Sequence, residues 1–484
     1  MGIVLNQSSK NFVVTYLGFG VGAINLLFLY TYFLPNDYHG LVSYILSTAA
    51  IMMPILALGT HNTIIKFYSS FRTRNSINSF LTLMLLFPFL AIIPIGVIGC
   101  FSYEMISNSL SKENEIIKNY VWLIYIAAIC FAYFEIFYAW AKVQMKSVFG
   151  NFMKEVFHRV GVLLLFIGIY YKWITVDDFI YGVIIIYILR VLIMMGYAFA
   201  LRRPVLRFKK ITNVSSIIKY SLLIIIAGSV ASIILEIDKF MLGQYIVIDN
   251  IAFYGIAVYI ATVIGVPARS MHQITNPITA KFLNDNDKES LKDLYKKSSI
   301  NLFIIGGFVF LLITLNINEL YTILPEEFRG GVLVVFLIGL AKLIDNLIGN
   351  NNAILFNSNY YRIVLLLGFI LAILAVILNV VLIPVYGIYG AAYATFISIV
   401  VYNICKVGFV YIKFKMIPFT LNTFKTIIVL GAFICTFYFW EFTFHPILNI
   451  ILKSMFISLL YAIIVYRFNL SDDITIILNK YIKK

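Results

Sequence analysis

The sequence predicts an all-α, polytopic membrane protein. Of its 484 residues, 62% are hydrophobic and only 12% are charged, and the mean hydropathy is +0.94. Soluble domains average about half apolar and about a quarter charged residues. Apolar runs of about 20 residues, the length that an α-helix needs to cross a bilayer, recur from one end of the chain to the other. Little of the chain remains for a soluble domain.

A hydropathy reading along the chain predicts fourteen membrane-spanning helices. The first apolar segment exceeds the core of a signal peptide, which is about 7 to 15 residues, so we expect it to be retained. Turn residues stand at the joints, as in "PNDYHG", "PEEFRGG" and "PVYG". The expected spans are 12–34, 40–67, 78–101, 116–144, 150–172, 178–200, 214–243, 250–280, 298–317, 330–352, 362–383, 387–412, 421–440 and 446–467.

The distribution of basic residues predicts that both termini are cytoplasmic, because short loops rich in Lys and Arg stay inside. This orientation places most of the basic residues at inner loops, among them Lys66, Arg72, Arg74, Lys142, Lys146, Lys154, Arg159, the run "RRPVLRFKK", the four lysines in 288–297, Lys413, Lys415 and those of the C-terminal tail. Those at the outer edge are Lys112, Lys118, Lys172, Arg329 and Lys453. The formal charge of +15 is therefore divided among separate loops. Topology and anionic lipids explain it better than nucleic acid does.

An internal repeat divides the predicted helices into two sets of six. At an offset of 215, Gly40, Tyr44 and Lys66 match Gly255, Tyr259 and Lys281. An offset of six helices preserves orientation, which predicts a parallel repeat about an axis along the membrane normal. We expect an N-terminal lobe at 1–208, a C-terminal lobe at 209–415 and two appended helices with a tail at 416–484. Two such lobes around a cavity suit alternating access.

Three charges stand close together in the seventh predicted helix, within "SIILEIDKFMLGQY". Glu236 and Lys239 are one turn apart, so an internal ion pair between them lowers the cost of desolvation. Asp238 then points to another side of the helix. We expect a gating or vestibule role for the three residues. The alternative is an interfacial cluster whose side chains reach the headgroups.

Each lobe also carries an embedded acid and an embedded base. Glu135 and Arg190 lie in the fourth and sixth predicted helices, and Asp345, with Lys342 one turn before it, lies in the tenth. Acids within a membrane can couple transport to H⁺ or Na⁺. Structural ion pairing is the alternative interpretation of the same residues.

The eighth predicted helix contains Arg269, just beyond Pro267, and His272 one turn later. A guanidinium inside the membrane is costly unless it is paired or wet. The spacing puts both side chains on one side of the helix. A contact with substrate in the cavity and a structural tie to an acid are the two interpretations.

Short motifs add a family resemblance. The phrase "IDKFMLGQYIVIDNIAFYGIAVY", the lysine that ends the second helix after "YHG", and "PVYGIYGAAYAT" resemble polysaccharide transporters of the multidrug/oligosaccharidyl-lipid/polysaccharide exporter superfamily, O-antigen flippases in particular. The resemblance covers nearly the whole chain. It implies translocation of an undecaprenyl-pyrophosphate-linked oligosaccharide across a bacterial cytoplasmic membrane, for assembly of O-antigen, lipopolysaccharide, capsule or another surface polysaccharide.

On this interpretation the expected contacts with the anionic substrate are Arg269, His272, Lys66 and Lys281, because a pyrophosphate needs fixed cations and hydrogen-bond donors. The expected partners are the lipid-linked oligosaccharide, membrane lipids, and a polysaccharide polymerase with its chain-length machinery. We expect a monomer, without a cofactor and without nucleic acid.

Two other functions compete with the flippase. A multidrug or organic-cation antiporter shares the superfamily, but such an exporter is expected to line its cavity with acids, whereas the embedded set here includes Arg190, Lys239, Arg269 and Lys342. A membrane polymerase or ligase is expected to have a long outer loop with basic catalytic residues, and the outer joints here are short. No catalytic nucleophile and base stand out, and the single cysteines offer no metal-binding spacing.

Overall fold

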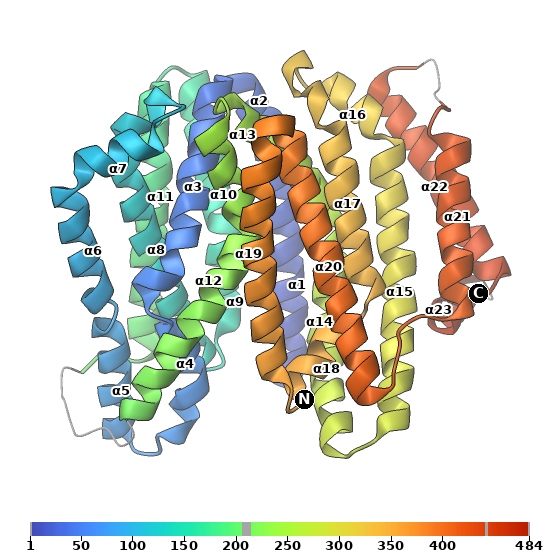
Figure 1. Ribbon diagram of the computed structural model, residues 1–484, viewed down its shortest axis with the longest axis horizontal. Coiled ribbons are helices and arrows are strands. Elements are labelled where there is room, and N and C mark those ends of the chain that lie inside the picture. Colours follow the sequence, from blue (N-terminus) through green and yellow to red (C-terminus); the bar gives the residue numbers. More distant parts are fainter. Residues whose placement is uncertain (1, 206–213, 441–443, 483–484) are drawn as a thin grey trace. The chain divides into compact units, whose positions relative to one another are not determined.

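The structure, a computed structural model, describes residues 2–205, 214–440 and 444–482 (Figure 1). Every regular element in these ranges is helical, which confirms the predicted all-α class. The chain divides into two compact units, Met1–Ala252 and Phe253–Lys484. The predicted lobe boundary at 208/209 lies outside the described residues, so the division into lobes stays a prediction.

Unit 1 consists of helices joined by short turns, several of them interrupted by π or 3₁₀ segments. Its elements are α1 (Gly2–Ala23), η1 (Ile24–Leu29), α2 (Tyr30–Phe33), α3 (Asn36–Ala57), α4 (Thr60–Phe67), η2 (Tyr68–Ser70), α5 (Arg74–Leu86), α6 (Phe89–Phe101), α7 (Tyr103–Leu110), η3 (Glu115–Tyr120), α8 (Val121–Lys142), α9 (Ser147–Phe152), η4 (Met153–Phe157), α10 (His158–Tyr170), α11 (Val176–Leu201) and α12 (Val214–Tyr245).

Unit 2 is built in the same way, and α13 begins just before its first residue. Its elements are α13 (Asp249–Thr262), η5 (Val263–Gly265), α14 (Val266–Asn284), α15 (Lys288–Leu315), α16 (Ile317–Ile323), η6 (Glu326–Gly331), α17 (Val332–Leu347), α18 (Asn351–Asn357), α19 (Tyr361–Tyr386), α20 (Ile388–Phe414), α21 (Leu421–Phe437), α22 (Pro446–Arg467) and α23 (Asp472–Ile482).

The predicted spans all fall on helical segments. Within the described ranges, 11 helices are long and apolar enough to cross a membrane, and α12, which bends by 56°, makes a twelfth. Two further segments fall short for different reasons. α21 is shorter than a full span, and the segment from α9 to α10 carries Lys154, Glu155 and Arg159. The protein is therefore a polytopic membrane protein.

Two of the motifs that carry the family resemblance meet in unit 1, where α12 packs on α3. A Cβ atom on Gly40 would lie 2.1 Å from the carbonyl oxygen of Ile248, and one on Gly243 would lie 2.5 Å from the ring of Tyr44. The Asn114 side chain, from the segment after α7, donates to the carbonyls of Gly243 and Ile246 and accepts from the amide of Ile248. Glycine at 40 and 243 is therefore a requirement of close packing.

The appended helices of unit 2 pack on α15 and α16. Lys453 of α22 forms an ion pair of 3.4 Å with Glu319 of α16, and the Lys453 side chain is only 1% exposed. The sequence places Lys453 at the outer edge, which stays a prediction, and the structure adds that Glu319 supplies a buried partner for its ammonium.

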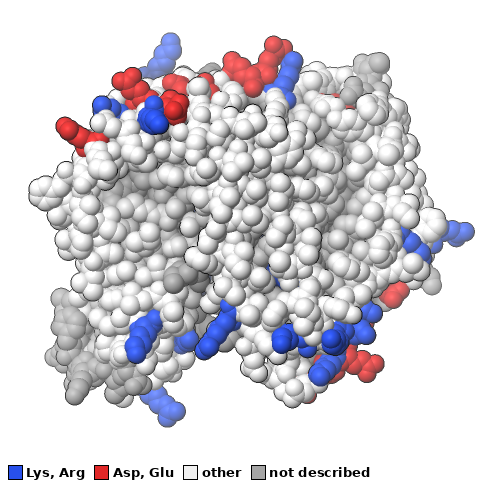
Figure 2. Space-filling view, in the orientation of Figure 1, with Lys and Arg blue, Asp and Glu red and all other residues white. Residues whose placement is uncertain are grey.

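Charge is unevenly distributed over the two ends of unit 1, and acidic side chains gather at its α7 end (Figure 2). The acids at this end are Asp37, Glu104, Glu113, Glu115, Asp177 and Asp178. Basic residues of the opposite end include Lys66, Arg72, Arg74, Lys146 and Arg202. This asymmetry is the pattern that a cytoplasmic position of the basic end produces.

Candidate functional site

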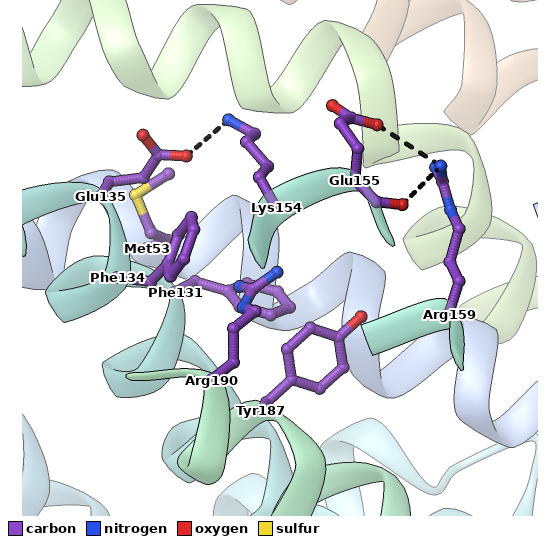
Figure 3. A pocket seen from close by; sticks show the side chains of 9 residues that line it. All are labelled: Met53, Phe131, Phe134, Glu135, Lys154, Glu155, Arg159, Tyr187 and Arg190. Atoms are coloured by element: carbon purple, nitrogen blue, oxygen red, sulfur yellow. Dashed lines mark hydrogen bonds and ion pairs between the residues drawn. The ribbon is translucent and has the colours of Figure 1, made fainter. Parts of the chain in front are cut away.

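A charged cavity of about 290 Å³ lies inside unit 1 (Figure 3). It is bounded by α3, α8, η4, α10 and α11. Its lining residues are Met53, Phe131, Phe134, Glu135, Lys154, Glu155, Arg159, Tyr187 and Arg190. Three of these side chains are cationic and two are anionic, so the lining carries one net positive charge. Charged side chains inside a membrane protein are costly and mark pathways for substrates and ions.

Glu135 and Lys154 form the first charged pair of the cavity. Nζ of Lys154 lies 2.5 Å from Oε1 of Glu135, and the two side chains are 44% and 17% exposed. α8 positions the acid, and η4 presents the base from the facing segment. Because Lys154 keeps substantial exposure, its ammonium is available to a second anion.

Arg190 lies deeper, on α11, and is 6% exposed. Its guanidinium carbon lies 4.1 Å from the ring centroid of Phe134, 4.7 Å from that of Tyr187 and 5.7 Å from that of Phe131 (Figure 3). Cation–π contacts of this kind contribute up to about 2 kcal/mol when desolvated. Among the described residues, Nε of Arg190 is buried without a hydrogen-bond partner. The arginine is therefore held by aromatic faces beside the cavity.

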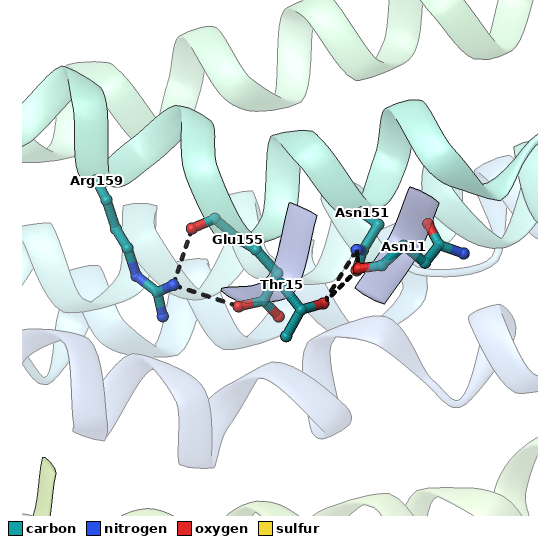
Figure 4. A network of polar contacts seen from close by, with 5 residues as sticks. All are labelled: Asn11, Thr15, Asn151, Glu155 and Arg159. Atoms are coloured by element: carbon teal, nitrogen blue, oxygen red, sulfur yellow. Dashed lines mark hydrogen bonds and ion pairs between the residues drawn. The ribbon is translucent and has the colours of Figure 1, made fainter. Parts of the chain in front are cut away.

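The second pair is formed by Glu155, in the π-helical segment η4, and Arg159, one turn later in α10. Nη1 of Arg159 lies 3.4 Å from Oε2 of Glu155 and donates to the Glu155 carbonyl at 2.9 Å (Figure 4). η4 is the π segment Met153–Phe157, and the wider turn inserts these charges into an otherwise apolar span. Isolated π turns occur often at functional sites.

Polar contacts from α1 hold this segment in place. The Asn151 amide donates to the Asn11 carbonyl at 3.1 Å and to Oγ1 of Thr15 at 3.3 Å (Figure 4). Asn25, in the π segment η1, donates to the Arg159 carbonyl at 2.7 Å. A Cβ on Gly18 would lie 2.5 Å from the Glu155 carbonyl oxygen, so α1 approaches η4 very closely. These contacts with α1 and η1 hold the backbone of residues 151–159, and with it the positions of Lys154, Glu155 and Arg159.

A second cavity of about 340 Å³ adjoins the first and shares Met53, Glu135 and Lys154 with it. His61 and Asn62 of α4 and Lys142 of α8 also line it. Leu58 and Gly59, between α3 and α4, have φ angles of +47° and +65°. This break separates α3 from α4 just before His61 and Asn62, so α4 does not continue the axis of α3.

The sequence places Lys142, Lys154 and Arg159 near the inner ends of the predicted spans 116–144 and 150–172, and that side of the membrane stays a prediction. All three are in helical segments, and all three line the two cavities. The available signal was the "KEVFHR" stretch, which interrupts an apolar run at the start of the fifth predicted span. A π turn has no clear sequence signature, so the facing of Lys154 toward Glu135 was not predictable.

Unit 2 contains a smaller polar cluster around Asp345 of α17. The Asn403 amide donates to Oδ1 of Asp345 at 2.7 Å. Lys406, one turn after Asn403 on α20, is 1% exposed, and its ammonium donates to Oδ1 of Asn352 at 3.2 Å. Asp345 could be recognised from the sequence, whereas Lys406 lies within the long apolar helix α20, which conceals it.

Other residues singled out from the sequence do not line the two cavities of unit 1. Lys239 pairs with Glu236 at 3.0 Å, as expected from their spacing, and Asp238 is buried. Lys66 lies in the last turn of α4, with its ammonium 3.8 Å from the ring centroid of Tyr220. Lys281 likewise lies in the last turn of α14. The gating role of the first group and the substrate contacts of the two lysines stay predictions.

Arg269 lies in the first turn of α14, directly after the 3₁₀ break η5 that divides the eighth predicted span. Its side chain is exposed. Lys342, one turn before Asp345, is half-buried, and its Cδ lies 3.7 Å from the Cβ position of Gly265, at that same break. Because its side chain is exposed, the guanidinium of Arg269 is accessible to a ligand.

Comparison with solved structures shows a shared fold. The lipid II flippase MurJ in an inward closed conformation matches with a TM-score of 0.74 and 14% identity, over 95% of this chain and 99% of that one. An inward-facing multidrug resistance MATE family transporter of the MOP superfamily matches with a TM-score of 0.56 and 14% identity, over 90% and 96%. The Vibrio cholerae MATE transporter VcmN in its bent form gives 0.55 and 13%, over 90% and 100%.

No protein-family model and no curated protein sequence matches the chain. At these identities the likeness defines the class of fold alone, one that this chain shares with the lipid II flippase and the MATE transporters, and it leaves the substrate open.

Proposed function

We propose that the protein flips an undecaprenyl-pyrophosphate-linked oligosaccharide across the bacterial cytoplasmic membrane by alternating access, for assembly of a surface polysaccharide. The fold shared with a lipid II flippase over nearly the whole chain supports transport of a lipid-linked substrate. The observation that carries the choice is the net positive charge of the cavity in unit 1. A pyrophosphate is the anionic part of such a substrate, and fixed cations recognise it.

In this proposal the exposed and the buried cations of the cavity have different roles. Lys154 and Arg159 exchange their carboxylate partners for phosphate oxygens, because each cation has both a counter-ion and access to the cavity. Arg190 supplies a permanent charge behind them that burial and aromatic faces keep in place. Arg269, His272, Lys66 and Lys281 are further proposed contacts for the headgroup, and Glu236, Asp238 and Lys239 a proposed gate.

Coupling to H⁺ or Na⁺ through Glu135 and Arg190 in unit 1, and Lys342 and Asp345 in unit 2, belongs to the same proposal. The termini are cytoplasmic in it, which agrees with the basic end of unit 1, and a polymerase with its chain-length machinery takes the product. An organic-cation antiporter is the second candidate, since MATE transporters share the fold. The cationic lining argues against it, because it would repel a cation.

Binding of inorganic pyrophosphate to the purified protein tests the proposed site. Glu135→Gln removes one negative charge beside Lys154 and should raise the affinity by about threefold to tenfold, the range expected for one partly screened charge. Lys154→Met should lower it by a similar factor. Lys146→Met is the matched control, because Lys146 is exposed and does not line the cavity. Equal affinities in all four proteins would reject the site.

A further inference from the structure

An apolar groove of about 250 Å³ lies elsewhere in unit 1, among α3, α6, α7 and α8. Its lining residues differ from those of the charged cavity. They include Met52, Ile95, Ile98, Ile106, Leu110 and Ile124, and apolar atoms make up nearly all of the lining. A groove of this kind is not a path for the charged headgroup. It requires an apolar occupant.

Two glycines of α6 keep the groove open. A Cβ on Gly99 would have no atom within 4 Å, so the space in front of this residue is free in the structure. A Cβ on Gly96 would lie 2.7 Å from the Tyr125 hydroxyl. That hydroxyl, from α8, donates to the Ile92 carbonyl of α6 at 2.5 Å. The bridge sets the spacing of α6 and α8 and prevents the helices from closing over the gap.

Aromatic residues stand at another part of the groove, next to the loop between α7 and α8. Tyr103 and Trp122 stack with their ring centroids 5.6 Å apart and their planes 15° apart. The Tyr103 hydroxyl donates to the Lys118 carbonyl at 3.2 Å, and Trp122 is 40% exposed. Tyr and Trp are enriched at the level of the lipid headgroups. This pair therefore marks the interfacial end of the groove.

The outer face of α6 is exposed and apolar, as lipid-facing surfaces are. Ile93, Val97 and Phe101 are 59%, 48% and 88% exposed, and α6 belongs to a segment that qualifies as a membrane span. The medium next to the groove is thus hydrocarbon. Water does not fill so apolar a gap, and an empty gap forfeits dispersion contacts along both walls. A polypeptide would bring backbone groups that need hydrogen bonds in hydrocarbon.

We propose that this groove binds one acyl chain of a membrane phospholipid, whose headgroup lies at Tyr103 and Trp122. The chain fills the space that Gly96 and Gly99 leave and packs α6 against α3 and α8. The site is separate from the proposed substrate site and does not depend on the proposed function.

Quenching of Trp122 fluorescence by a phospholipid with a brominated acyl chain tests the proposal. The protein is purified in detergent and titrated with the brominated lipid, and the Trp122 signal is the difference between wild-type and Trp122→Phe protein. We expect saturable quenching at about one lipid per protein. Gly99→Leu, which fills the groove, should weaken binding by about tenfold, equivalent to about 1.4 kcal/mol. Gly431→Leu on α21 is the matched control, because a Cβ there also meets no atom within 4 Å.

Ile98→Phe narrows the same groove from an exposed position and serves where Gly99→Leu does not yield folded protein. Quenching that rises without saturation and is equal in wild type and both groove variants would mean contact with bulk lipid alone and overturn the proposal. Undecaprenyl phosphate provides a competition test. Displacement of the brominated phospholipid by much less of the polyprenyl lipid than of unlabelled phospholipid would assign the groove to a polyprenyl tail and overturn it as well.

Discussion

Arg190 illustrates how a residue can hold a charge in a membrane without a carboxylate against it. Three aromatic rings surround its guanidinium beside a cavity that contains both acids and bases. These aromatic neighbours stabilise the positive charge of Arg190 without neutralising it, so the charge still acts on the cavity. By contrast, Lys154 and Arg159 each form an ion pair with a carboxylate.

Arg190→Met should abolish transport while the protein level in the membrane stays normal. The apolar side chain keeps much of the volume and removes a costly buried charge, and such replacements are often neutral for stability. Export of the polymer, normalised to membrane protein level, is the measurement. Arg190→Lys separates charge from shape and should retain partial export. Wild-type export by Arg190→Met would remove Arg190 from the proposed site.

Arg269 provides a second test at the scale of one residue. Because its side chain is exposed at the start of α14, Arg269→Ala leaves no cavity and should not alter protein abundance. If the guanidinium binds pyrophosphate in bidentate fashion, Arg269→Ala abolishes export, and Arg269→Lys impairs it despite keeping the charge. A structural tie predicts a loss of protein instead, with destabilisation of about 3 to 5 kcal/mol. Full export by Arg269→Ala at normal abundance contradicts the proposed contact.

At the scale of elements, the contact of α3 with the α12–α13 turn depends on the absence of a side chain. Gly40→Ala places a methyl group within 2.1 Å of the Ile248 carbonyl oxygen. The turn must move away from α3, at a cost of about 1 to 3 kcal/mol. Thermal unfolding in detergent should show a lower midpoint for Gly40→Ala. Gly20→Ala on α1 is the control, because it meets no atom within 4 Å and should leave the midpoint unchanged or slightly raised.

The attachment of α22 to α16 depends on one buried ion pair. Lys453→Met leaves the Glu319 carboxylate buried without its cation and should destabilise unit 2 by about 3 to 5 kcal/mol. The double variant Lys453→Met with Glu319→Gln removes both charges and should recover most of that loss. Urea or thermal unfolding of the three proteins is the measurement. If the double variant is no more stable than Lys453→Met, the loss of stability comes from the lost attraction between Lys453 and Glu319. It would then not come from the unpaired carboxylate left in the interior.

The sequence alone predicts much of the element structure, for identifiable reasons. Apolar periodicity and turn residues placed a helical segment at every expected span, since a bilayer permits few alternatives. The spacing of Glu236 and Lys239 predicted their pair correctly. Interruptions inside spans were not predictable. The π turns at η1 and η4, the left-handed residues Leu58 and Gly59, and the break at η5 depend on packing between helices.

The same limit applies to the candidate site. Glu135 and Arg190 could be recognised because a charge in the middle of an apolar run is conspicuous. Lys154 and Arg159 stand near the start of a span, where charges ordinarily face the headgroups, and only the fold shows that they face Glu135 and Glu155. Lys406 is concealed by the hydropathy of its helix, and the burial of Lys453 against Glu319 could not be inferred from its place at the end of a predicted span; both lysines are 1% exposed.

For the whole molecule, the fold and the cavity bear on different parts of the proposal. The shared fold spans nearly the full length of both a lipid II flippase and MATE transporters. The likeness concerns the fold and does not choose between an anionic lipid-linked substrate and an organic cation. In the proposal, that choice rests on the charge of the unit 1 cavity, which has three cationic and two anionic side chains.

Transport by the purified protein in liposomes tests the central claim most directly. Vesicles are loaded with a fluorescent undecaprenyl-pyrophosphate-linked oligosaccharide, and the fraction accessible to an external, membrane-impermeant reagent is followed over time. The account predicts protein-dependent movement of this lipid between leaflets, lost in Arg190→Met and retained in Lys146→Met, without protein-dependent uptake of tetraphenylphosphonium in parallel vesicles. Uptake of the organic cation, with no movement of the lipid-linked oligosaccharide above protein-free vesicles, would contradict it.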